Sequence, residues 1–458
     1  MRNDRLIFRK LFLFFGDACM LLLSLYLALI LRQLSFLDWK NVVPVFDVFV
    51  PIFLLLLATF FLFDLYNLRS IRNFYRTIYL IYLALIFSSL FITILLYVSP
   101  KEVTPKTVLF LFDIFALFLL SAWRFLYKKY SSNLRYIRKV AVIGTDLINE
   151  NFEKILRSID GVDYKIIGYF GEARTRSFPA FTNLAHLGDF SAIKSTIKRK
   201  NIDELVIAFD FIQHPKIVKD LSDSLAYGVR IYNWEAFYEY IFQKVPTNSI
   251  DHFWFINNID ESDKKFYELF KRTADLLFSL TGTIILVFLL PLITLGIKLS
   301  SKGPIFYSQI RVGRDGLNFK LRKFRTMRED AEKNGAKWAD RHDDRIFPFG
   351  RFLRKTRLDE IPQFLNILKG DMSIVGPRPE RPEFIPVLQE KIPFYYKRNM
   401  VLPGLTGYAQ IMFPYAASIE DSIEKVGYDL YYIKHRSLFM YFKIILKTIK
   451  TILAFGGR

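Results

Sequence analysis

Four long apolar runs open the chain, and each approaches the length of a membrane-spanning helix. They cover residues 11–31, 46–63, 78–98 and 108–126. A helix needs about 20 mainly apolar residues to cross the hydrocarbon core of a bilayer. The first run is longer than the apolar region of a typical signal peptide, and no clear small-residue cleavage site follows it. We therefore predict a membrane α-helical bundle of four spans over residues 1–130, with an uncleaved first helix.

Basic residues alternate from one side of these runs to the other. They precede the first run, occupy the loop at residues 69–76 and follow the fourth run. Because cytoplasmic loops carry an excess of Lys and Arg, both ends of the bundle are expected in the cytoplasm, together with the chain that follows. Asp17, Asp64 and Asp113 lie in or at the ends of the runs. We interpret them as structural residues that reach the interface.

The middle of the chain alternates short strand-like runs with helical stretches such as residues 149–158. The strand-like runs cover residues 139–144, 164–170, 205–209 and 229–232. This alternation predicts a Rossmann-like α/β domain with a parallel sheet over residues 138–258. Gly144 stands almost alone after the first run, so the Gly-x-Gly-x-x-Gly fingerprint for a pyrophosphate is missing. We therefore favour regulation, spacing or self-association over nucleotide binding for this domain.

A fifth apolar segment, residues 274–297, contains Pro291 and has basic residues on both sides. A full crossing would place one basic flank outside, against the charge bias of membrane proteins. An interior proline removes a backbone hydrogen bond and bends a helix, at a cost of about 3 kcal/mol. We predict a re-entrant helix that enters the membrane, bends and returns to the same face. The alternative is an ordinary fifth crossing with a proline kink.

The composition fits a membrane protein that binds anions. The chain is 52% hydrophobic and 17% aromatic, and its formal net charge is +20. A charge of this size indicates an anionic partner, which can be nucleic acid, anionic lipid or a phosphorylated substrate. No nucleic-acid-binding motif is present, so we expect no nucleic acid partner. The single Cys19 and five scattered histidines exclude an intramolecular disulfide and give no zinc-site spacing.

The last third of the chain carries three ordered motifs. The first runs from Lys302-Gly-Pro to Lys323-Phe-Arg-Thr-Met327 and predicts a hairpin that ends in the cations Lys323 and Arg325. The third runs from Gly370 to Pro377-Arg-Pro-Glu380, and its prolines stiffen the loop that carries Arg378. Guanidinium groups match phosphate oxygens.

The second motif, Arg351-Phe-Leu-Arg-Lys-Thr-Arg-Leu-Asp-Glu-Ile-Pro-Gln363, places arginines before two acids. On a helix Arg351, Arg354 and Arg357 would share a face and could bind a diphosphate. Pro362 suits an early position of the next helix and Gly370 its end, which would put the acids at a helix N-terminus.

Two interpretations of these acids stay open on this pattern. Asp359 and Glu360 are either caps of the helix, whose dipole favours a carboxylate anion, or catalytic groups. In the second case an ionised aspartate is a competent nucleophile for phosphorus, and a neighbouring glutamate can bind Mg²⁺.

With these motifs the chain resembles the bacterial sugar transferase family, the polyprenyl-phosphate sugar-1-phosphate transferases that initiate exopolysaccharide, capsule and O-antigen assembly. The resemblance covers residues 266–458, and the four-helix start and the α/β middle look like the large form of the family. It implies an α-rich catalytic domain whose nucleophile is Asp359 and whose Mg²⁺ ligand is Glu360. It also implies that Lys323, Arg354 and Arg378 lie near the substrate phosphates. By the same resemblance, Pro291 is the proline that breaks the re-entrant helix.

The resemblance implies a two-step reaction at the cytoplasmic face of the bacterial inner membrane. Asp359 attacks the sugar-bearing phosphorus of a nucleotide sugar, and polyprenyl phosphate then takes the sugar phosphate from the aspartate. The implied partners are a nucleotide sugar, with UDP as its nucleotide, polyprenyl phosphate and membrane lipid. No residue indicates which sugar is used, and a homodimer is an open alternative.

Two positions depart from the family pattern. Leu290 stands where a serine often precedes the proline, and Leu402 stands where a cation usually precedes Pro-Gly-x-Thr-Gly, with Arg398 as a candidate to compensate. A catalytically inactive membrane scaffold of polysaccharide assembly therefore stays an alternative. A sugar epimerase or reductase in the α/β domain is weakened by the missing glycines.

The end of the chain has helical periodicity. Lysines and apolar residues within residues 442–452 fall on two separate stripes. This pattern predicts either an amphipathic helix at the membrane interface or a core helix with one wet face.

Overall fold

The computed structural model forms two compact units, Met1–Tyr136 and Ile137–Arg458, which we describe separately. The residues that it describes are 2–33, 52–57, 59–60, 63, 65–66, 74–98, 106–132, 137–144, 164–171, 184–209, 217, 221–222, 225–259, 264–329, 331, 343–413 and 418–453.

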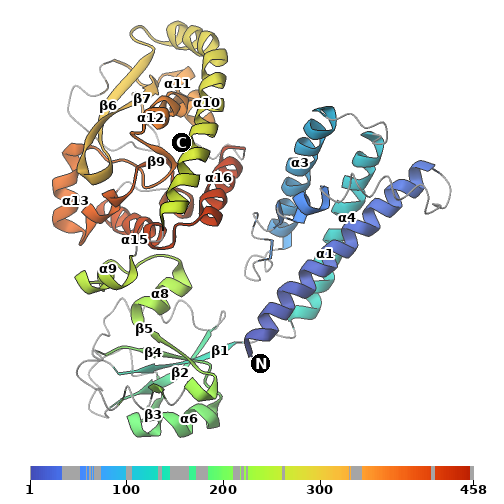
Figure 1. The fold of residues 1–458 in the computed structure, drawn as a ribbon, viewed down its shortest axis with the longest axis vertical. Coiled ribbons are helices and arrows are strands. Elements are labelled where there is room, and N and C mark those ends of the chain that lie inside the picture. Colours follow the sequence, from blue (N-terminus) through green and yellow to red (C-terminus); the bar gives the residue numbers. More distant parts are fainter. Residues whose placement is uncertain are drawn as a thin grey trace. The chain divides into compact units, whose positions relative to one another are not determined.

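The N-terminal unit is built from apolar helices, as predicted. Its long helices are α1 (Arg2–Gln33), α3 (Phe74–Val98) and α4 (Lys106–Ser132) (Figure 1). The stretches Lys10–Arg32 and Thr107–Tyr130 are long and apolar enough to cross a membrane, whereas the described apolar part of α3, Phe74–Ser89, is shorter. The predicted run at residues 46–63 lies partly outside the described residues. The number of four spans therefore stays a prediction.

Polar contacts between these helices involve two of the three acids noted above. Asp17 accepts a hydrogen bond from Arg124, and both side chains are buried. Asp113 accepts one from Ser89 at 2.6 Å. A buried charge is tolerated when it is paired, so these contacts agree with a structural role. Asp64 lies outside the described residues.

A five-stranded parallel sheet opens the second unit, which confirms the predicted α/β class. Its order is β3-β2-β1-β4-β5, and every described pairing is parallel. The strands are β1 (Arg138–Ile143), β2 (Tyr164–Phe170), β3 (His186–Gly188), β4 (Glu204–Ile207) and β5 (Arg230–Asn233). Alternate residues of β1 and β4 enter two separate hydrophobic clusters, one on each face of the sheet. The predicted helix at residues 149–158 lies outside the described residues.

The carboxyl ends of β1 and β4 form the edge where open parallel sheets usually bind ligands. Here Gly144 has a φ of +77°, and a Cβ added to it would lie 2.7 Å from the ring of Phe209. Phe209 is buried and its ring lies 6.1 Å from that of Phe190. Aromatic side chains therefore fill the described part of this edge.

The catalytic part of the chain follows two short helices, α8 (Trp234–Phe242) and α9 (His252–Asn258). The predicted hairpin is confirmed, since β6 and β7 pair antiparallel. The principal elements of this part of the chain are α10 (Lys265–Ser300), β6 (Phe306–Val312), β7 (Asn318–Phe324), α11 (Pro348–Thr356), η8 (Leu358–Gln363), α12 (Phe364–Lys369), β8 (Ser373–Val375), η10 (Tyr395–Met400), β9 (Gly404–Thr406), α15 (Ile419–His435) and α16 (Leu438–Leu453).

The segment between α8 and α10 packs into the hydrophobic core of the C-terminal domain. Val245, Trp254 and Phe255 precede α10 in the sequence, yet they belong to the same buried cluster as Ile433 of α15 and Tyr441 of α16. The segment around α9 is therefore packed as part of the catalytic domain. α16 is amphipathic, and its apolar side lies in this core, as the core-helix alternative predicted.

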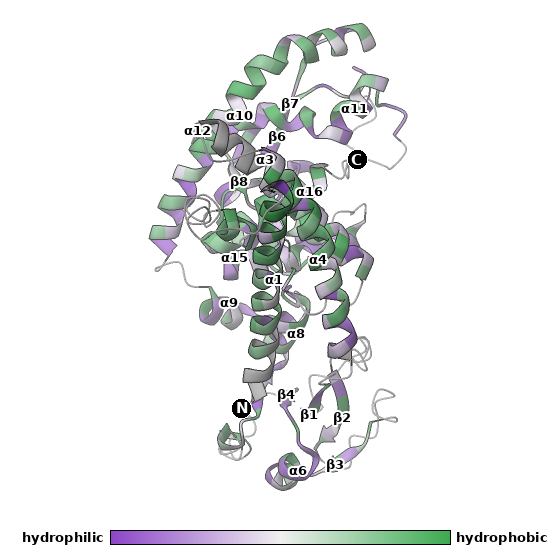
Figure 2. Cartoon of the chain, turned by 90° about the vertical axis from the view of Figure 1, so that its right-hand side faces the viewer, coloured by the Kyte–Doolittle hydropathy of each residue, from purple (hydrophilic) through white to green (hydrophobic). Residues whose placement is uncertain are grey.

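Helix α10 is continuous over 36 residues and contains Pro291 (Figure 1). Much of its surface is apolar and exposed, as at Leu277 and Phe288 (Figure 2). Both halves of the helix nevertheless contact the catalytic domain. A Cβ on Gly282 would lie 2.4 Å from Phe364 of α12, and one on Gly296 would lie 2.4 Å from Phe349 of α11. These glycines lie about 21 Å apart along a helix, less than the ~30 Å hydrocarbon core.

Candidate active site

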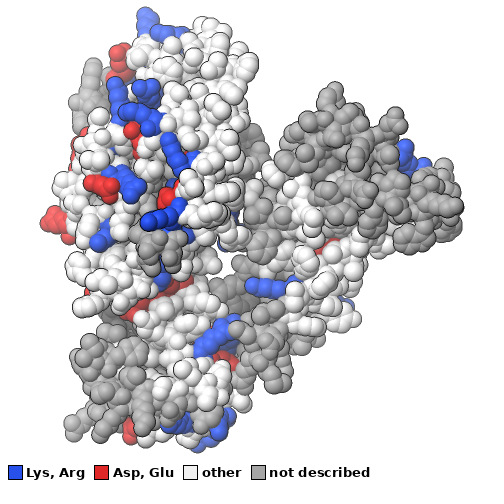
Figure 3. All heavy atoms as spheres, in the orientation of Figure 1, with Lys and Arg blue, Asp and Glu red and all other residues white. Residues whose placement is uncertain are grey.

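A pocket of about 460 Å³ lies beside the β6–β7 hairpin. This volume is in the range of small-molecule sites. Its walls come from the hairpin, the segment from α11 to η8, the loop with Arg378, η10 and the first turns of α15. The residues that line it include many Lys and Arg, and Lys and Arg also gather on the upper part of the second unit in the view of Figure 3. The pocket is therefore suited to an anionic ligand.

The turn between α11 and η8 brings both acids into the pocket. Helix α11 ends at Thr356, and Arg357 adopts a left-handed conformation with a φ of +60°. Asp359 and Glu360 then lie in the first turn of η8, buried, with exposed fractions of 6% and 8%. The predicted helix start is confirmed, although it begins as a 3-10 turn, and Gly370 ends α12 in a left-handed conformation as expected.

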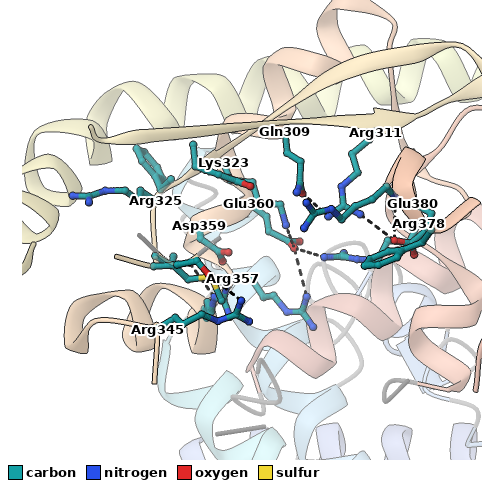
Figure 4. Close-up of a pocket in the computed structure, with 18 of the residues that line it drawn as sticks. Gln309, Arg311, Lys323, Arg325, Arg345, Arg357, Asp359, Glu360, Arg378 and Glu380 are labelled. Carbon is teal, nitrogen blue, oxygen red and sulfur yellow. Dashed lines mark hydrogen bonds and ion pairs between the residues drawn. The ribbon is translucent and has the colours of Figure 1, made fainter. Parts of the chain in front are cut away.

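Glu360 is surrounded by three cations. Its Oε1 accepts a hydrogen bond from Arg378 at 3.0 Å and one from Lys323 at 3.3 Å, and Arg357 lies 3.8 Å away (Figure 4). Burial alone would raise the pKa of Glu360, but the charges of Lys323, Arg378 and Arg357 outweigh it and lower the pKa well below its usual range. Glu360 is therefore ionised, and one negative charge stands among three positive ones.

Asp359 has a different environment from its neighbour. Its Oδ1 is buried and has no hydrogen-bond partner among the described residues. Burial, and then the charge of Glu360, raise the pKa of Asp359 to about 6, against the opposing charges of Lys323 and Arg354. The carboxylate therefore keeps an oxygen that is not used by the fold.

The arginines of the second motif separate in the structure. Arg354 and Arg357 line the pocket, and Arg354 donates to Thr326 Oγ1 at 3.0 Å. Arg351 is exposed on α11 and is not among the lining residues. The expectation that all three share one helical face is wrong: Arg351 and Arg354 lie on α11, whereas Arg357 follows this helix in a left-handed conformation.

Arg325 lines the pocket, but its guanidinium is used elsewhere. It donates to the carbonyl oxygen of Lys302 at 2.6 Å and to that of Ser301 at 2.9 Å, just after the end of α10. In Figure 4 its side chain points away from Asp359 and Glu360. Arg325 thus anchors the end of α10 to the hairpin, a contact that the sequence did not predict.

Several pocket residues were missed by the sequence analysis. Arg311 on β6 donates to Gln309 at 2.8 Å and to the carbonyl oxygen of Pro379 at 3.1 Å (Figure 4). Burial lowers the pKa of Arg311 to about 10. Glu380 and Arg381 also line the pocket. All of them lie inside or beside the motifs quoted above. Their closeness to these motifs was the one feature of the sequence that could have indicated them.

Gly350 makes the close approach of α11 to the hairpin possible. A Cβ at this position would lie 2.3 Å from the carbonyl oxygen of Thr326. We expect Gly350→Ala to lower the free energy of unfolding by about 1–3 kcal/mol through overpacking, which exceeds the ~1 kcal/mol gain in helix propensity. Denaturant unfolding in detergent measures this. Arg351→Ala on the same helix should change it by less than about 0.5 kcal/mol, and an equally stable Gly350→Ala would contradict the expectation.

The chemistry of the two acids fits the Mg²⁺ that the sequence implied. Carboxylate oxygens are preferred ligands of Mg²⁺, which usually keeps water and binds substrate phosphates as well. The three cations contact one oxygen of Glu360, and Asp359 Oδ1 lies buried without a partner in the described chain. Within those same residues, no group of three or more His, Cys, Asp or Glu side chains could hold a metal. The remaining ligands would have to come from substrate and water.

Comparison with known proteins places this site in a family. Residues 266–455, which contain every pocket residue named above, match the model of the "Bacterial sugar transferase" family. A relative from Bacillus subtilis, "Putative undecaprenyl-phosphate N-acetylgalactosaminyl 1-phosphate transferase", is 47% identical over 132 residues, which are 29% of this chain and 74% of that protein. The chain belongs to the bacterial sugar transferase family.

Other relatives of this sugar transferase carry related names. One from Aeromonas hydrophila, "UDP-N-acetylgalactosamine-undecaprenyl-phosphate N-acetylgalactosaminephosphotransferase", is 42% identical over 193 residues, or 42% of this chain and 46% of that protein. One from Escherichia coli (strain K12), "UDP-glucose:undecaprenyl-phosphate glucose-1-phosphate transferase", is 39% identical over 40% of this chain and 39% of its own length. The matched segments thus span less than half of these two relatives.

A second family model, described as "CoA-binding domain", matches residues 62–232 of the sugar transferase. This range contains β1 to β4 and most of β5. It agrees with the α/β class of the middle domain.

Proposed function

We propose that the protein transfers a sugar-1-phosphate from a UDP-sugar to undecaprenyl phosphate through a phospho-aspartate, as the first step of exopolysaccharide or O-antigen type glycan assembly. The observation that carries the proposal is the pairing of Asp359 and Glu360 in one cation-lined pocket. The names of the relatives, which combine undecaprenyl phosphate with UDP-sugars, support it.

Asp359 is the proposed nucleophile. Its carboxylate oxygen attacks the phosphorus that bears the sugar, and the bond from this phosphorus to the bridging oxygen breaks, so that UMP leaves. An oxygen of undecaprenyl phosphate then attacks the same phosphorus, and the bond to Asp359 breaks. The carboxylate is restored, and the product is an undecaprenyl diphosphate sugar.

The cations around the acids stabilise the charge that gathers on the phosphates. Lys323, Arg354, Arg357 and Arg378 would orient the diphosphate, because charge in a phosphoryl transfer is spread over the phosphate oxygens. Glu360 would hold Mg²⁺, which would supply further charge neutralisation. Arg351, which is exposed, remains a candidate for a contact outside the pocket.

Helix α10 supports access to a lipid acceptor. Its apolar surface is exposed, while both halves pack on the catalytic domain over a span shorter than a bilayer core. These contacts favour a helix that dips into one leaflet at Pro291 and returns, with the catalytic domain at the cytoplasmic face of the inner membrane. A full crossing would separate Gly296 and the end of α10 from α11 and the hairpin, which they contact.

The function is tested with full-length protein in nanodiscs that contain undecaprenyl phosphate and Mg²⁺. We expect UMP release from one UDP-sugar of a panel of glucose, galactose and their N-acetylated forms, together with a lipid-linked sugar product. Folded protein that releases no UMP from any of them would contradict the proposal and favour the scaffold alternative.

The activity should also depend on pH through Asp359. Because burial and Glu360 raise the pKa of Asp359 to about 6, the group is protonated and inactive below this pH. We expect kcat/KM for the UDP-sugar to rise with pH along a limb centred near 6. In Glu360→Gln, followed in single turnovers, the limb should move to lower pH, because a neighbouring negative charge is removed. A limb that is identical in both proteins would contradict this assignment.

A further inference from the structure

Helix α15 is held on two opposite faces. On one face, Lys434 donates to Glu239 of α8 at 2.8 Å and Glu424 pairs with Lys244. On the other face, Ser422, Lys425 and Val426 line the pocket. At 100° per residue, these two sets of positions on α15 lie on roughly opposite sides of the helix. In Figure 1, α15 accordingly lies between α8 and α9 and the rest of the catalytic domain.

The contact with the α/β domain is close at the backbone as well. The amide of Val245 donates to the carbonyl oxygen of Gly427 at 3.0 Å. A Cβ added to Gly427 would lie 2.7 Å from the carbonyl oxygen of Val245. We call Glu239, Lys244 and Val245 the clamp. Its backbone contact leaves no room for a side chain, so the position of α15 along the clamp is sharply defined.

The face of α15 that lines the pocket is connected to the loop that carries Arg378. Asp429 is buried, accepts a hydrogen bond from Arg398 Nε at 3.1 Å and forms an ion pair with Arg398 Nη2 at 2.8 Å. Arg398 on η10, also buried, donates to Tyr395 Oη at 2.8 Å and to the carbonyl oxygen of Arg378 at 2.9 Å. The side chain of Arg378 in turn binds Glu360.

We propose that the α/β domain positions the catalytic site: the clamp fixes α15, and Asp429 and Arg398 transmit that position to Arg378. This inference rests on the proposed function only in naming the ligand of Arg378 as a phosphate group. Asp429, which does not line the pocket, is then a positioning residue that acts through Arg398 and Arg378, and Arg398 holds the loop of Arg378 from the pocket wall. The connection is a continuous series of short polar contacts and one rigid helix, the kind of network that carries coupling between sites.

The geometry at residue 398 suits a guanidinium. Three of its nitrogens serve three different partners, Asp429, Tyr395 and the carbonyl oxygen of Arg378. A lysine would keep the charge but could not hold that planar arrangement. Arg398 thus holds the loop of Arg378 through a backbone contact, while it also lines the pocket.

The test uses three single variants of the full-length protein in nanodiscs. Gly427→Ala inserts a methyl group between α15 and the clamp, Glu239→Gln removes the charge that pairs with Lys434, and Asp429→Asn breaks the inner contact. We expect each to raise the donor KM and to lower kcat, by about 10-fold to 100-fold for Asp429→Asn and by less for the clamp variants. The apparent Kd for UDP, measured by calorimetry, should rise in parallel.

A double variant tests the coupling itself. Because the clamp and Asp429 act on the same loop, the effects of Gly427→Ala and Asp429→Asn should be clearly less than multiplicative in kcat/KM. Arg398→Lys should behave like Asp429→Asn. His186→Ala serves as the control in the α/β domain, since His186 lies on the edge strand β3 and contacts the carbonyl of Gly171. Its kinetic constants should match the wild type.

Three outcomes would overturn the inference. These are clamp variants with wild-type kcat, KM and UDP affinity, effects that multiply independently with Asp429→Asn, or a loss that His186→Ala reproduces. Thermal unfolding identifies any variant that fails to fold. If Gly427→Ala fails to fold, the kinetic constants of Glu239→Gln decide the test in its place. If the wild type released no UMP at all, the proposed function would fail, whereas UDP affinity would still test the positioning of Arg378.

Discussion

Asp359→Asn is expected to abolish UMP release, with a fall in kcat of at least about 10⁴-fold, which is the scale seen when an enzyme loses its nucleophile. An amide of the same size fills the same buried position, so the pocket should persist. The amide oxygen, however, carries no charge and cannot form the phosphoryl bond. UMP release measured with each UDP-sugar, before and after the substitution, gives the result directly.

A single-turnover experiment separates this role from a merely electrostatic one. Without undecaprenyl phosphate, the wild type should release at most one UMP per active site and retain the sugar phosphate on the protein. Asp359→Asn should show neither the burst nor the label. UDP affinity in the variant should be equal or higher, because a negative charge has been removed from the pocket. Turnover in Asp359→Asn above about a tenth of the wild-type rate would reject Asp359 as nucleophile.

Glu360→Gln should have two effects of opposite sign. Turnover should fall by about 10²-fold to 10³-fold, since the variant loses the anion that would hold Mg²⁺ and align Arg378. UDP binding without Mg²⁺ should instead become tighter, because the cations on Glu360 Oε1 lose their internal counter-charge. Calorimetry in the presence of EDTA measures the second effect.

Glu383→Gln is the matched control for this second substitution. Glu383 pairs with Arg381 but its side chain is 56% exposed, and it is not among the lining residues of the pocket. Its kcat and its UDP affinity should remain close to those of the wild type. Weaker UDP binding in Glu360→Gln would mean that Glu360 organises the cations and does not compete with the ligand for them.

Local patterns predicted the parts of this site that depend on neighbouring residues. Pro362 lies early in the helical segment that begins with the two acids, Gly370 ends that segment, and the glycines after β6 predicted the hairpin. In the same way, the alternation of apolar runs predicted the parallel sheet. The helical turn and the hairpin depend on interactions that span only a few residues, and the sheet class follows from the regular alternation of strands and helices, so the sequence indicates all three.

Other features depended on contacts between distant segments and were not predicted. Arg357 adopts a positive φ, which a non-glycine residue rarely does and which no sequence signal indicated. The pairing of Arg398 with Asp429 joins positions 31 residues apart, and that of Lys434 with Glu239 joins positions 195 apart. The sequence gives the residues of α15 but not the partners that they meet on distant segments.

The packing of the α9 segment into the core of the catalytic domain has a practical consequence for anyone who shortens this protein. A fragment that starts at residue 266, where the family match begins, would lack Val245, Trp254 and Phe255 and leave the apolar side chains around Ile433 in water. Such a fragment should self-associate through that exposed patch. A cut placed ahead of Val245 keeps α9 and with it the cover over this core, but it removes Glu239 and Lys244, which pair with Lys434 and Glu424 of α15.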